Sequence, residues 1–216
     1  MSNAIFARFF DLVAGKAEAR GQAELRRELL AGLTGRIVEV GPGNGLNFPH
    51  YPREVTEVVA VEPQPYLRGR AAETARTAPV DVRVTDGTAE RIPVGDAGAD
   101  AVVVSGVLCS VPAPGAALAE FRRVLRPGGR LRFYEHVRAD GGWGRRQDLV
   151  DPVWSRLMGG CHTNRDTVAE LERAGYRIER CRRLVFPREA RLSVVAPRVI
   201  GTAAAGGVNA APRGVE

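Results

Sequence analysis

The chain has 216 residues, of which 44% are hydrophobic and 26% charged, and it carries a formal net charge of +6. This length and apolar content suit one α/β domain with a sizeable core. No stretch approaches the roughly 18 to 20 uninterrupted apolar residues of a membrane-spanning helix, and the N-terminal residues lack the pattern of a secretory signal. We therefore expect a cytoplasmic protein, either a monomer or a weak homodimer.

The positive charge raises the question of nucleic-acid binding, because basic surfaces gain affinity for phosphate backbones. The cationic residues are almost all arginines, and Lys16 is the only lysine. The arginines are scattered in pairs such as Arg26-Arg27 and Arg122-Arg123. Because no single element collects them, we expect no nucleic-acid partner.

The three cysteines, Cys109, Cys161 and Cys181, include no CxxC pair. Their spacing predicts neither a disulfide framework nor a metal site. Free thiols fit a reducing compartment.

A helix is expected within residues 18–32, because Leu25, Leu29 and Leu30 recur at near-helical spacing and Gly32 follows them. After Arg36, short β-branched or aromatic runs alternate with helix-like segments. The predicted strands cover 36–40, 55–62, 80–86, 99–105 and 130–137, and the predicted helices cover 65–78 and 114–129. This alternation predicts right-handed crossovers and a doubly wound, Rossmann-like α/β fold.

Residues 139–164 break the alternation with glycines and two tryptophans, which indicates an inserted segment. A helix is expected to follow at 165–176, with Thr163 and Asp166 as a capping box and Gly175 at its end. The last predicted strands, 176–186 and 191–203, are separated by a short turn and are expected to pair antiparallel at the sheet edge. The whole sheet is then seven-stranded and mostly parallel.

A glycine-rich loop follows the first predicted strand. It consists of Gly41, Pro42, Gly43, Asn44 and Gly45. Open α/β sheets bind nucleotides at such a turn. The dinucleotide fingerprint needs glycine or alanine where this chain has Leu46, so NAD is a poor match. Glu39 suits a cofactor that carries ammonium and sulfonium cations, and Glu62, after the second strand, can accept hydrogen bonds from two ribose hydroxyls. These features predict S-adenosylmethionine.

Four motifs carry a family resemblance: VEVGPGNG, VVAVEP, DGTAERIPVGDAGADAVV and LRPGGRLRFYEHV. With these motifs the chain resembles class I S-adenosylmethionine-dependent methyltransferases of the type 11 group. The resemblance implies that the loop after the third strand holds the adenine, with Thr88 where the group usually has aspartate, followed by Ala89. The full set of expected cofactor-binding residues is Glu39, Gly41, Gly43, Asn44, Gly45, Glu62, Pro63, Thr88, Ala89, Ser105 and Leu108.

Three further segments give a closer resemblance: residues 108–137, DPVWSRLMGGCHTNRDTV and VVAPRVIGTA. They resemble a methyltransferase-like family whose animal members act on small alkyl and aryl thiols. The resemblance implies methylation of a thiol sulfur. We expect an N-terminal helical lid over residues 1–35 and a methyltransferase domain over 36–202. Because the last residues show no apolar period, we expect a flexible tail over 203–216.

Other functions remain open from the residues alone. A related fold can methylate carbon or oxygen of a quinone-like or natural-product acceptor. A cofactor-binding regulatory protein without turnover is the non-enzyme alternative.

The candidate catalytic residues are Glu135 and His136, at the end of the fifth predicted strand, and His162 in the inserted segment. Histidine titrates near neutral pH and can remove a proton from an acceptor. Side chains alternate along a strand, so one of Glu135 and His136 is expected to be structural. His162 either faces the acceptor or holds the loop. Methyl transfer from a sulfonium requires no metal.

Overall fold

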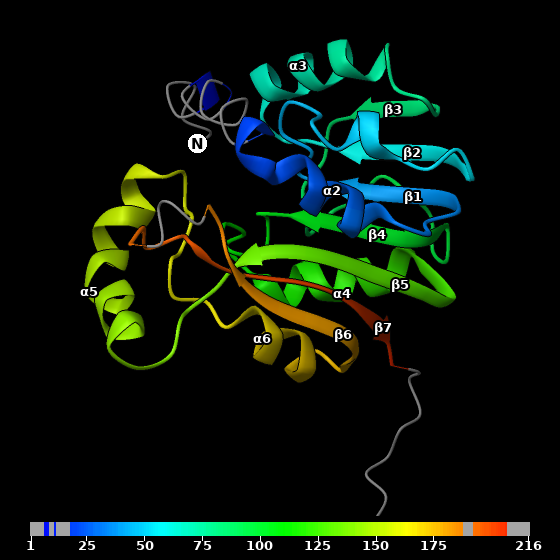
Figure 1. Cartoon of the computed structure of the whole chain (residues 1–216). Coiled ribbons are helices and arrows are strands. Elements are labelled where there is room, and N and C mark those ends of the chain that lie inside the picture. Colours follow the sequence, from blue (N-terminus) through cyan, green and yellow to red (C-terminus); the bar gives the residue numbers. More distant parts are fainter. Residues whose placement is uncertain (1–6, 9–10, 12–17, 188–191, 207–216) are drawn as a thin grey trace, which may run out of the picture.

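The centre of the computed structural model, which describes residues 7, 8, 11, 18–187 and 192–206, is a seven-stranded sheet (Figure 1). Its strand order is β3-β2-β1-β4-β5-β7-β6. The strands are β1 (Gly35–Val40), β2 (Val55–Val61), β3 (Val82–Thr85), β4 (Ala99–Ser105), β5 (Leu125–His136), β6 (Tyr176–Val185) and β7 (Pro197–Ala205). Strands β1 to β5 pair in parallel, and β7 runs antiparallel to both β5 and β6. The predicted fold class is confirmed.

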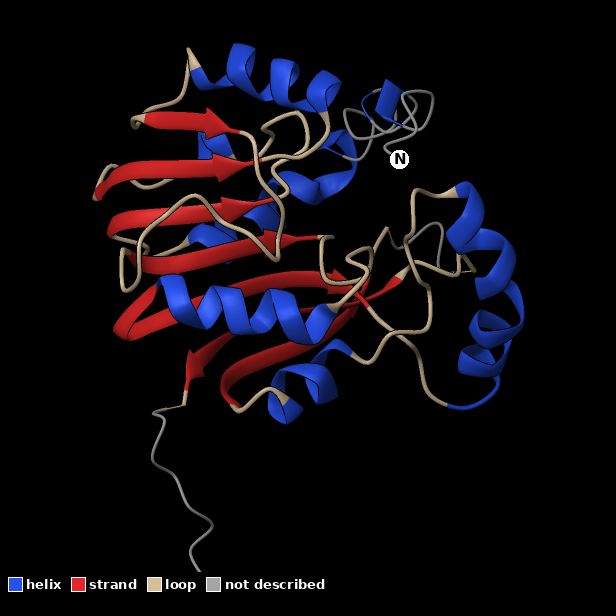
Figure 2. Ribbon diagram, turned by 180° about the vertical axis from the view of Figure 1, so that it is seen from behind, coloured by secondary structure: helices blue, strands red, loops and turns tan. Residues whose placement is uncertain are grey.

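Helices cover both faces of this sheet, as a comparison of Figure 1 with Figure 2 shows. The helices are α2 (Ala23–Leu30), α3 (Pro65–Ala75), α4 (Pro114–Val124), α5 (Gly141–Leu157) and α6 (Thr167–Arg173). Helices α2 and α3 share a buried cluster with one sheet face, and α4 and α6 share a second cluster with the other. The central strands are therefore apolar on both sides: Val58, Val59, Ala60 and Val61 are fully buried.

The strand order creates a topological switch point between β1 and β4. From β1 the chain proceeds through β2 to β3 on one side, and then returns to form β4 and β5 on the other. In open α/β sheets, the crevice that binds ligands lies at such a point, beside the loops that leave these two strands.

Five local predictions need correction. Residues 125–129, predicted as the end of a helix, are the beginning of β5. Residues 139–164 contain the 17-residue helix α5, which Pro152 and several glycines concealed in the sequence. Helix α6 is capped by Asp166, whose side chain accepts a hydrogen bond from the Ala169 amide, and not by Thr163. The connection from β6 to β7 spans residues 186–196 and is no short turn. Strand β7 continues to Ala205, so residues 203–205 belong to the sheet and not to a tail.

Of the predicted lid over residues 1–35, residues 1–6, 9–10 and 12–17 lie outside the described residues. Within the described part, α2 packs on the sheet, because Leu29 and Leu30 are buried in the same cluster as Ile37 and Val58. Residues 23–30 are thus part of the core. The division into lid, domain and tail otherwise remains a prediction.

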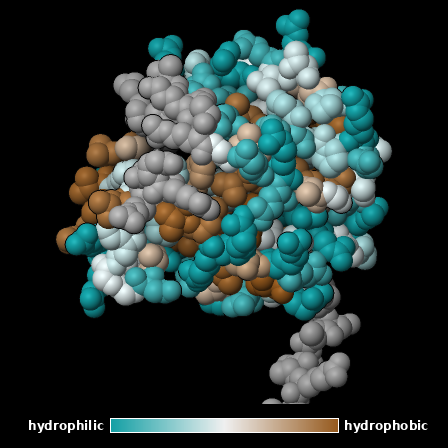
Figure 3. All heavy atoms as spheres, viewed as in Figure 1, coloured by the Kyte–Doolittle hydropathy of each residue, from teal (hydrophilic) through white to brown (hydrophobic). Residues whose placement is uncertain are grey.

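Helix α5 lies beyond the carboxyl ends of the parallel strands and presents apolar side chains to solvent. Leu149 is 82% exposed, Val153 61% and Leu157 65%. Hydrophobic surface gathers over this helix in Figure 3. In the described part of the chain, no helix is both long and apolar enough to cross a bilayer.

We expect Phe121→Ala to be strongly destabilising. Phe121 is fully buried on α4 against the sheet, and removing a buried aromatic ring costs roughly 3 to 5 kcal/mol through lost burial and the cavity left behind. Denaturant titration of both proteins measures this difference. Leu149→Ala, on exposed α5 surface, is the control and should change the free energy of unfolding by less than about 0.5 kcal/mol. Similar values for the two variants would contradict this view of the core.

Candidate active site

The glycine loop after β1 forms a tight turn at the switch point. Gly41, Gly43 and Gly45 all have positive φ angles, of 65°, 61° and 84°. A Cβ at Gly41 would lie 2.7 Å from Val107 Cγ2, and one at Gly45 would lie 2.7 Å from Phe48. Glycine is therefore required here both for the backbone conformation and for close approach. Because Val107 follows β4, the same contact brings the β4 loop against the glycine loop.

Glu62, the residue after β2, joins this loop to the second strand. Its side chain is buried and accepts hydrogen bonds from the backbone amides of Gly43 and Gln64, each at 3.0 Å. A carboxylate offers about four acceptor positions, so each oxygen keeps a free one. Burial raises the pKa of Glu62, and the two amides partly oppose that effect. The sequence prediction of an acid beside the glycine loop thus has a suitable geometry.

Glu39 has a different environment from the one expected of a residue that faces the cofactor. Its two oxygens accept hydrogen bonds from Asn47 Nδ2 and the Tyr51 hydroxyl, both at 2.7 Å. Arg26 on α2 donates to Asn47 Oδ1 at 2.8 Å. Glu39 therefore fixes the chain that follows the glycine loop, and its contact with the cofactor remains a prediction. Sequence reasoning missed Asn47, which has no recognisable motif.

The other predicted cofactor residues lie around the same crevice but differ in accessibility. Thr88 and Ala89 follow β3, where Thr88 is exposed and Ala89 buried. Pro63 is exposed next to Glu62, and Ser105 ends β4. The Leu108 side chain is fully buried in the core cluster, so only its backbone is available to a ligand. These assignments remain predictions.

Glu135, a candidate catalytic residue, is fully buried and forms hydrogen bonds with backbone amides. Its carboxylate accepts hydrogen bonds from the amides of Val107, at 2.9 Å, and Cys109, at 3.4 Å. Burial raises the pKa of Glu135. The carboxylate therefore holds the loop after β4 in place, and a catalytic role for Glu135 remains a prediction.

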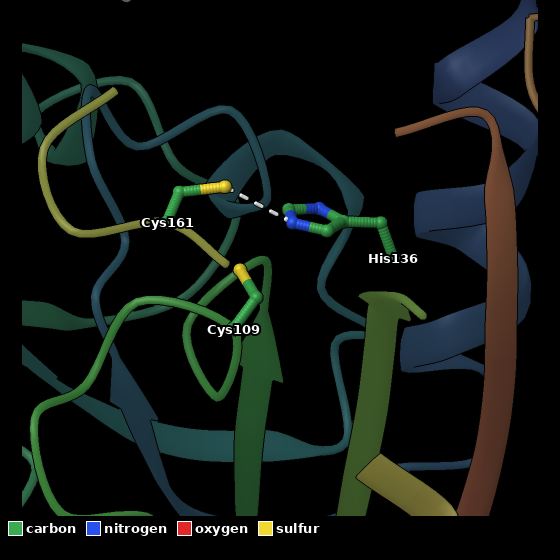
Figure 4. Close-up of side chains that lie close together, drawn as sticks. All are labelled: Cys109, His136 and Cys161. Carbon is green, nitrogen blue, oxygen red and sulfur yellow. Dashed lines mark hydrogen bonds between the residues drawn. The ribbon is translucent and has the colours of Figure 1, made fainter. Parts of the chain in front are cut away.

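His136 points toward two cysteine side chains (Figure 4). Its Nε2 lies 3.1 Å from Cys161 Sγ, and the ligand atoms of Cys109, His136 and Cys161 all lie within 4.8 Å of one another. The contact with Cys109, aided by His136, lowers the pKa of Cys161 to about 4. The same contact, with burial, raises the pKa of Cys109. Sequence reasoning treated these residues separately, because His136 lies 27 positions after Cys109, and Cys161 lies 25 positions after His136.

His162 holds the inserted segment against the β4 loop. Its Nδ1 lies 2.8 Å from Asp151 Oδ2, and its backbone amide donates to the Cys109 carbonyl at 2.8 Å. Asp151 also accepts a hydrogen bond from the Thr163 amide at 2.6 Å. These contacts match the loop-holding alternative for His162.

Gln147, on helix α5, is fully buried and connects the inserted segment to the chain on either side of it. The Gln147 Nε2 group lies within hydrogen-bond distance of the carbonyls of Val137, Thr163 and Val194, and its Oε1 accepts from the Ala139 amide. One side-chain amide therefore contacts three parts of the chain: the residues before α5, the residues after α5 and the residues that lead into β7.

Comparison with known proteins identifies the family. The family model described as a methyltransferase domain matches residues 38–133. Human thiol S-methyltransferase TMT1B is 37% identical over 165 residues, which cover 70% of this chain and 67% of that protein. Human thiol S-methyltransferase TMT1A is 35% identical over 177 residues, covering 77% of this chain and 72% of that protein. The chain belongs to the S-adenosylmethionine-dependent methyltransferases.

A solved structure of a geranyl diphosphate methyltransferase in complex with S-adenosylmethionine has the same fold as this methyltransferase. The TM-score is 0.65 at 16% identity, with 86% of this chain and 85% of that chain covered. S-adenosylmethionine is the cofactor of this methyltransferase, and the crevice fits it. The turn at Gly41, Gly43 and Gly45 leaves no side chain in the way, and Glu62 keeps free acceptor positions beside it.

We expect Glu62→Ala to weaken S-adenosylmethionine binding at least tenfold. A hydrogen bond to a charged group contributes roughly 1.5 to 3 kcal/mol, and about 1.4 kcal/mol corresponds to a factor of ten in affinity. Calorimetric titration measures the change. Glu73→Ala, an exposed acid on the neighbouring helix α3, is the control and should bind as the unaltered protein does. Equal affinity of Glu62→Ala and the control would exclude this placement of the ribose.

The pH dependence of binding should report the same carboxylate. Burial raises the pKa of Glu62, so protonation begins at a higher pH than for an ordinary glutamate. Affinity should therefore decline as the pH falls through this raised pKa, because the protonated group is a poorer acceptor for ribose hydroxyls. Glu62→Gln should bind more weakly at neutral pH and lose this part of the decline. An identical pH profile for both proteins would assign the titration to another group.

Proposed function

We propose that this methyltransferase transfers its methyl group to the sulfur of a small thiol. The supporting observation is the composition of the carboxyl edge near the glycine loop: two thiols and an imidazole converge there, while Glu135 and Asp151 already accept hydrogen bonds from the protein. A hydroxyl or carbon acceptor needs a strong, available base. A thiol with a pKa of about 8.5 is partly ionised at neutral pH. The names of the human relatives agree with this choice.

The cofactor half of the site is assigned to the glycine loop and Glu62. When bound, S-adenosylmethionine supplies a methyl group on a sulfonium, which is already activated toward nucleophiles. The turn at Gly41 to Gly45 admits the cofactor, and Glu62 receives the ribose hydroxyls. Thr88 and Ala89 lie where the adenine is expected. Asn44, Pro63 and Ser105 line the same crevice in this proposal.

The residues around the methyl acceptor have two main tasks: they orient the nucleophile and keep it ionised. In-line displacement gains most from alignment of the reacting atoms. His136 is the group proposed to promote formation of the acceptor thiolate, since its Nε2 faces the buried sulfur cluster. Glu135 acts as a positioning residue, because it fixes the amides of Val107 and Cys109. His162 positions the inserted segment through Asp151.

The proposed partner is a small molecule and not nucleic acid. Many arginines form ion pairs within the chain, among them Arg36 with Glu57, Arg68 with Asp86 and Arg123 with Glu120. These pairs reduce the charge available to a phosphate backbone. The cysteines Cys109, Cys161 and Cys181 are all free thiols, which suits the proposed cytoplasmic location. A monomer or weak homodimer remains the proposed assembly.

The acceptor class is tested by His136→Ala with thiols, phenols and quinols as substrates. For a thiol, the rate should fall moderately at neutral pH and recover as the pH rises, because the thiolate forms without assistance. For a phenol or carbon acid, loss of a general base should cost roughly 100- to 10,000-fold without such recovery. Radiolabelled methyl transfer between neutral and mildly alkaline pH separates these cases.

The matched variant is His162→Ala, which removes a histidine held by Asp151 and leaves His136 in place. We expect it to retain the pH profile of the unaltered enzyme. Methylation of phenols or quinols but of no thiol in the panel would overturn the proposal in favour of O- or C-methylation. Tight cofactor binding with no turnover of any acceptor would favour the regulatory alternative.

A further inference from the structure

The cluster of Cys109, His136 and Cys161 has the donor set of a metal site. The three residues come from three separate segments: the loop after β4, the end of β5 and the loop after α5. All three are buried, and their ligand atoms lie within 4.8 Å of one another. Thiolate and imidazole are the ligands that Zn²⁺ prefers, and two cysteines with one histidine can bind it while a fourth position stays open.

The distances suit an ion at the centre of the cluster. With Zn–S bonds of about 2.3 Å and Zn–N bonds of about 2.0 Å, tetrahedral geometry separates sulfur and nitrogen ligands by roughly 3.5 Å. His136 Nε2 and Cys161 Sγ are 3.1 Å apart. This pair therefore needs to open by only a few tenths of an ångström to admit the ion, and the other two ligand separations are at most 4.8 Å.

Three hydrogen bonds hold the three segments together without any of the three side chains, and a fourth bond reaches one ligand sulfur. The His162 amide donates to the Cys109 carbonyl at 2.8 Å, and the Arg138 amide donates to the Arg165 carbonyl at 3.0 Å. Arg165 also donates to the Leu108 carbonyl. The Trp154 indole lies 3.4 Å from Cys161 Sγ, as a hydrogen-bond donor to that sulfur. Such outer contacts orient the ligands of metal sites.

We propose that Cys109, His136 and Cys161 bind a thiophilic metal ion, Zn²⁺ in the first instance, and that its fourth position receives the acceptor thiol. The second half of this statement rests on the proposed function. A thiol that enters this position displaces a water molecule and releases one proton to solvent, which leaves a bound thiolate beside the glycine loop. A disulfide between Cys109 and Cys161 would use the two sulfurs but give no role to His136.

The test uses the full chain, purified with a phosphine reductant and stripped of metal with a chelator. Zn²⁺ is titrated against a chromophoric chelator, and Co²⁺ is added separately as a spectroscopic probe. The expected result is one equivalent of either metal, with thiolate-to-cobalt charge transfer and the intense visible bands of four-coordinate cobalt.

Substitution of single ligands identifies the site. Cys109→Ser, Cys161→Ser and His136→Ala should each weaken Zn²⁺ binding by more than the 10- to 100-fold that loss of an outer contact costs. The matched control is Cys181→Ser, since Cys181 is exposed on β6 outside the cluster. It should bind Zn²⁺ as the unaltered protein does. Circular dichroism and S-adenosylmethionine affinity verify that each variant is folded.

Several outcomes would overturn the proposal. One is absence of stoichiometric metal uptake by the reduced chain, whether or not its isolated form carries a Cys109–Cys161 disulfide. Another is Zn²⁺ affinity in folded Cys109→Ser equal to that of Cys181→Ser. If no small thiol changes the cobalt spectrum, the acceptor thiol does not bind to the metal. Metal binding without methylation of any thiol would instead contradict the proposed function and leave the metal site standing.

Discussion

Three buried carboxylates hold the carboxyl edge of the sheet in shape. Glu39, Glu62 and Glu135 lie at or next to the ends of β1, β2 and β5, and each accepts hydrogen bonds from a neighbouring loop. Removing these groups from water is unfavourable unless the lost hydration is replaced. Each carboxylate therefore strongly favours the loop conformation that supplies its donors. The crevice at the switch point depends on this requirement.

The acids act on different parts of the crevice. Glu62 fixes the glycine loop that receives the cofactor, whereas Glu135 fixes the loop after β4, where Cys109 lies. The two loops touch through Gly41 and Val107. In the proposed site, cofactor and acceptor are thus positioned by one edge of the sheet, which suits a displacement reaction that depends on alignment.

Much of the fold follows from local sequence patterns, because β-branched runs and amphipathic helices between them are short-range signals. The glycine loop and Glu62 were predictable for the same reason. Helix α5 was not, because Pro152 and three glycines within it, Gly141, Gly142 and Gly144, obscure its period. The convergence of Cys109, His136 and Cys161 was also out of reach. It depends on where the inserted segment docks, which no spacing rule encodes.

The contact of Gln147 with three carbonyls has a consequence for how this enzyme can evolve. The Gln147 side-chain amide forms hydrogen bonds with the chain before and after α5. The exposed surface of this helix can therefore accumulate substitutions while the sheet keeps its register. Changes near the end of this segment alter the surroundings of Cys161, which accepts a hydrogen bond from Trp154 of α5. The exposed face of α5 can vary in sequence without loss of the hydrogen bonds that Gln147 makes.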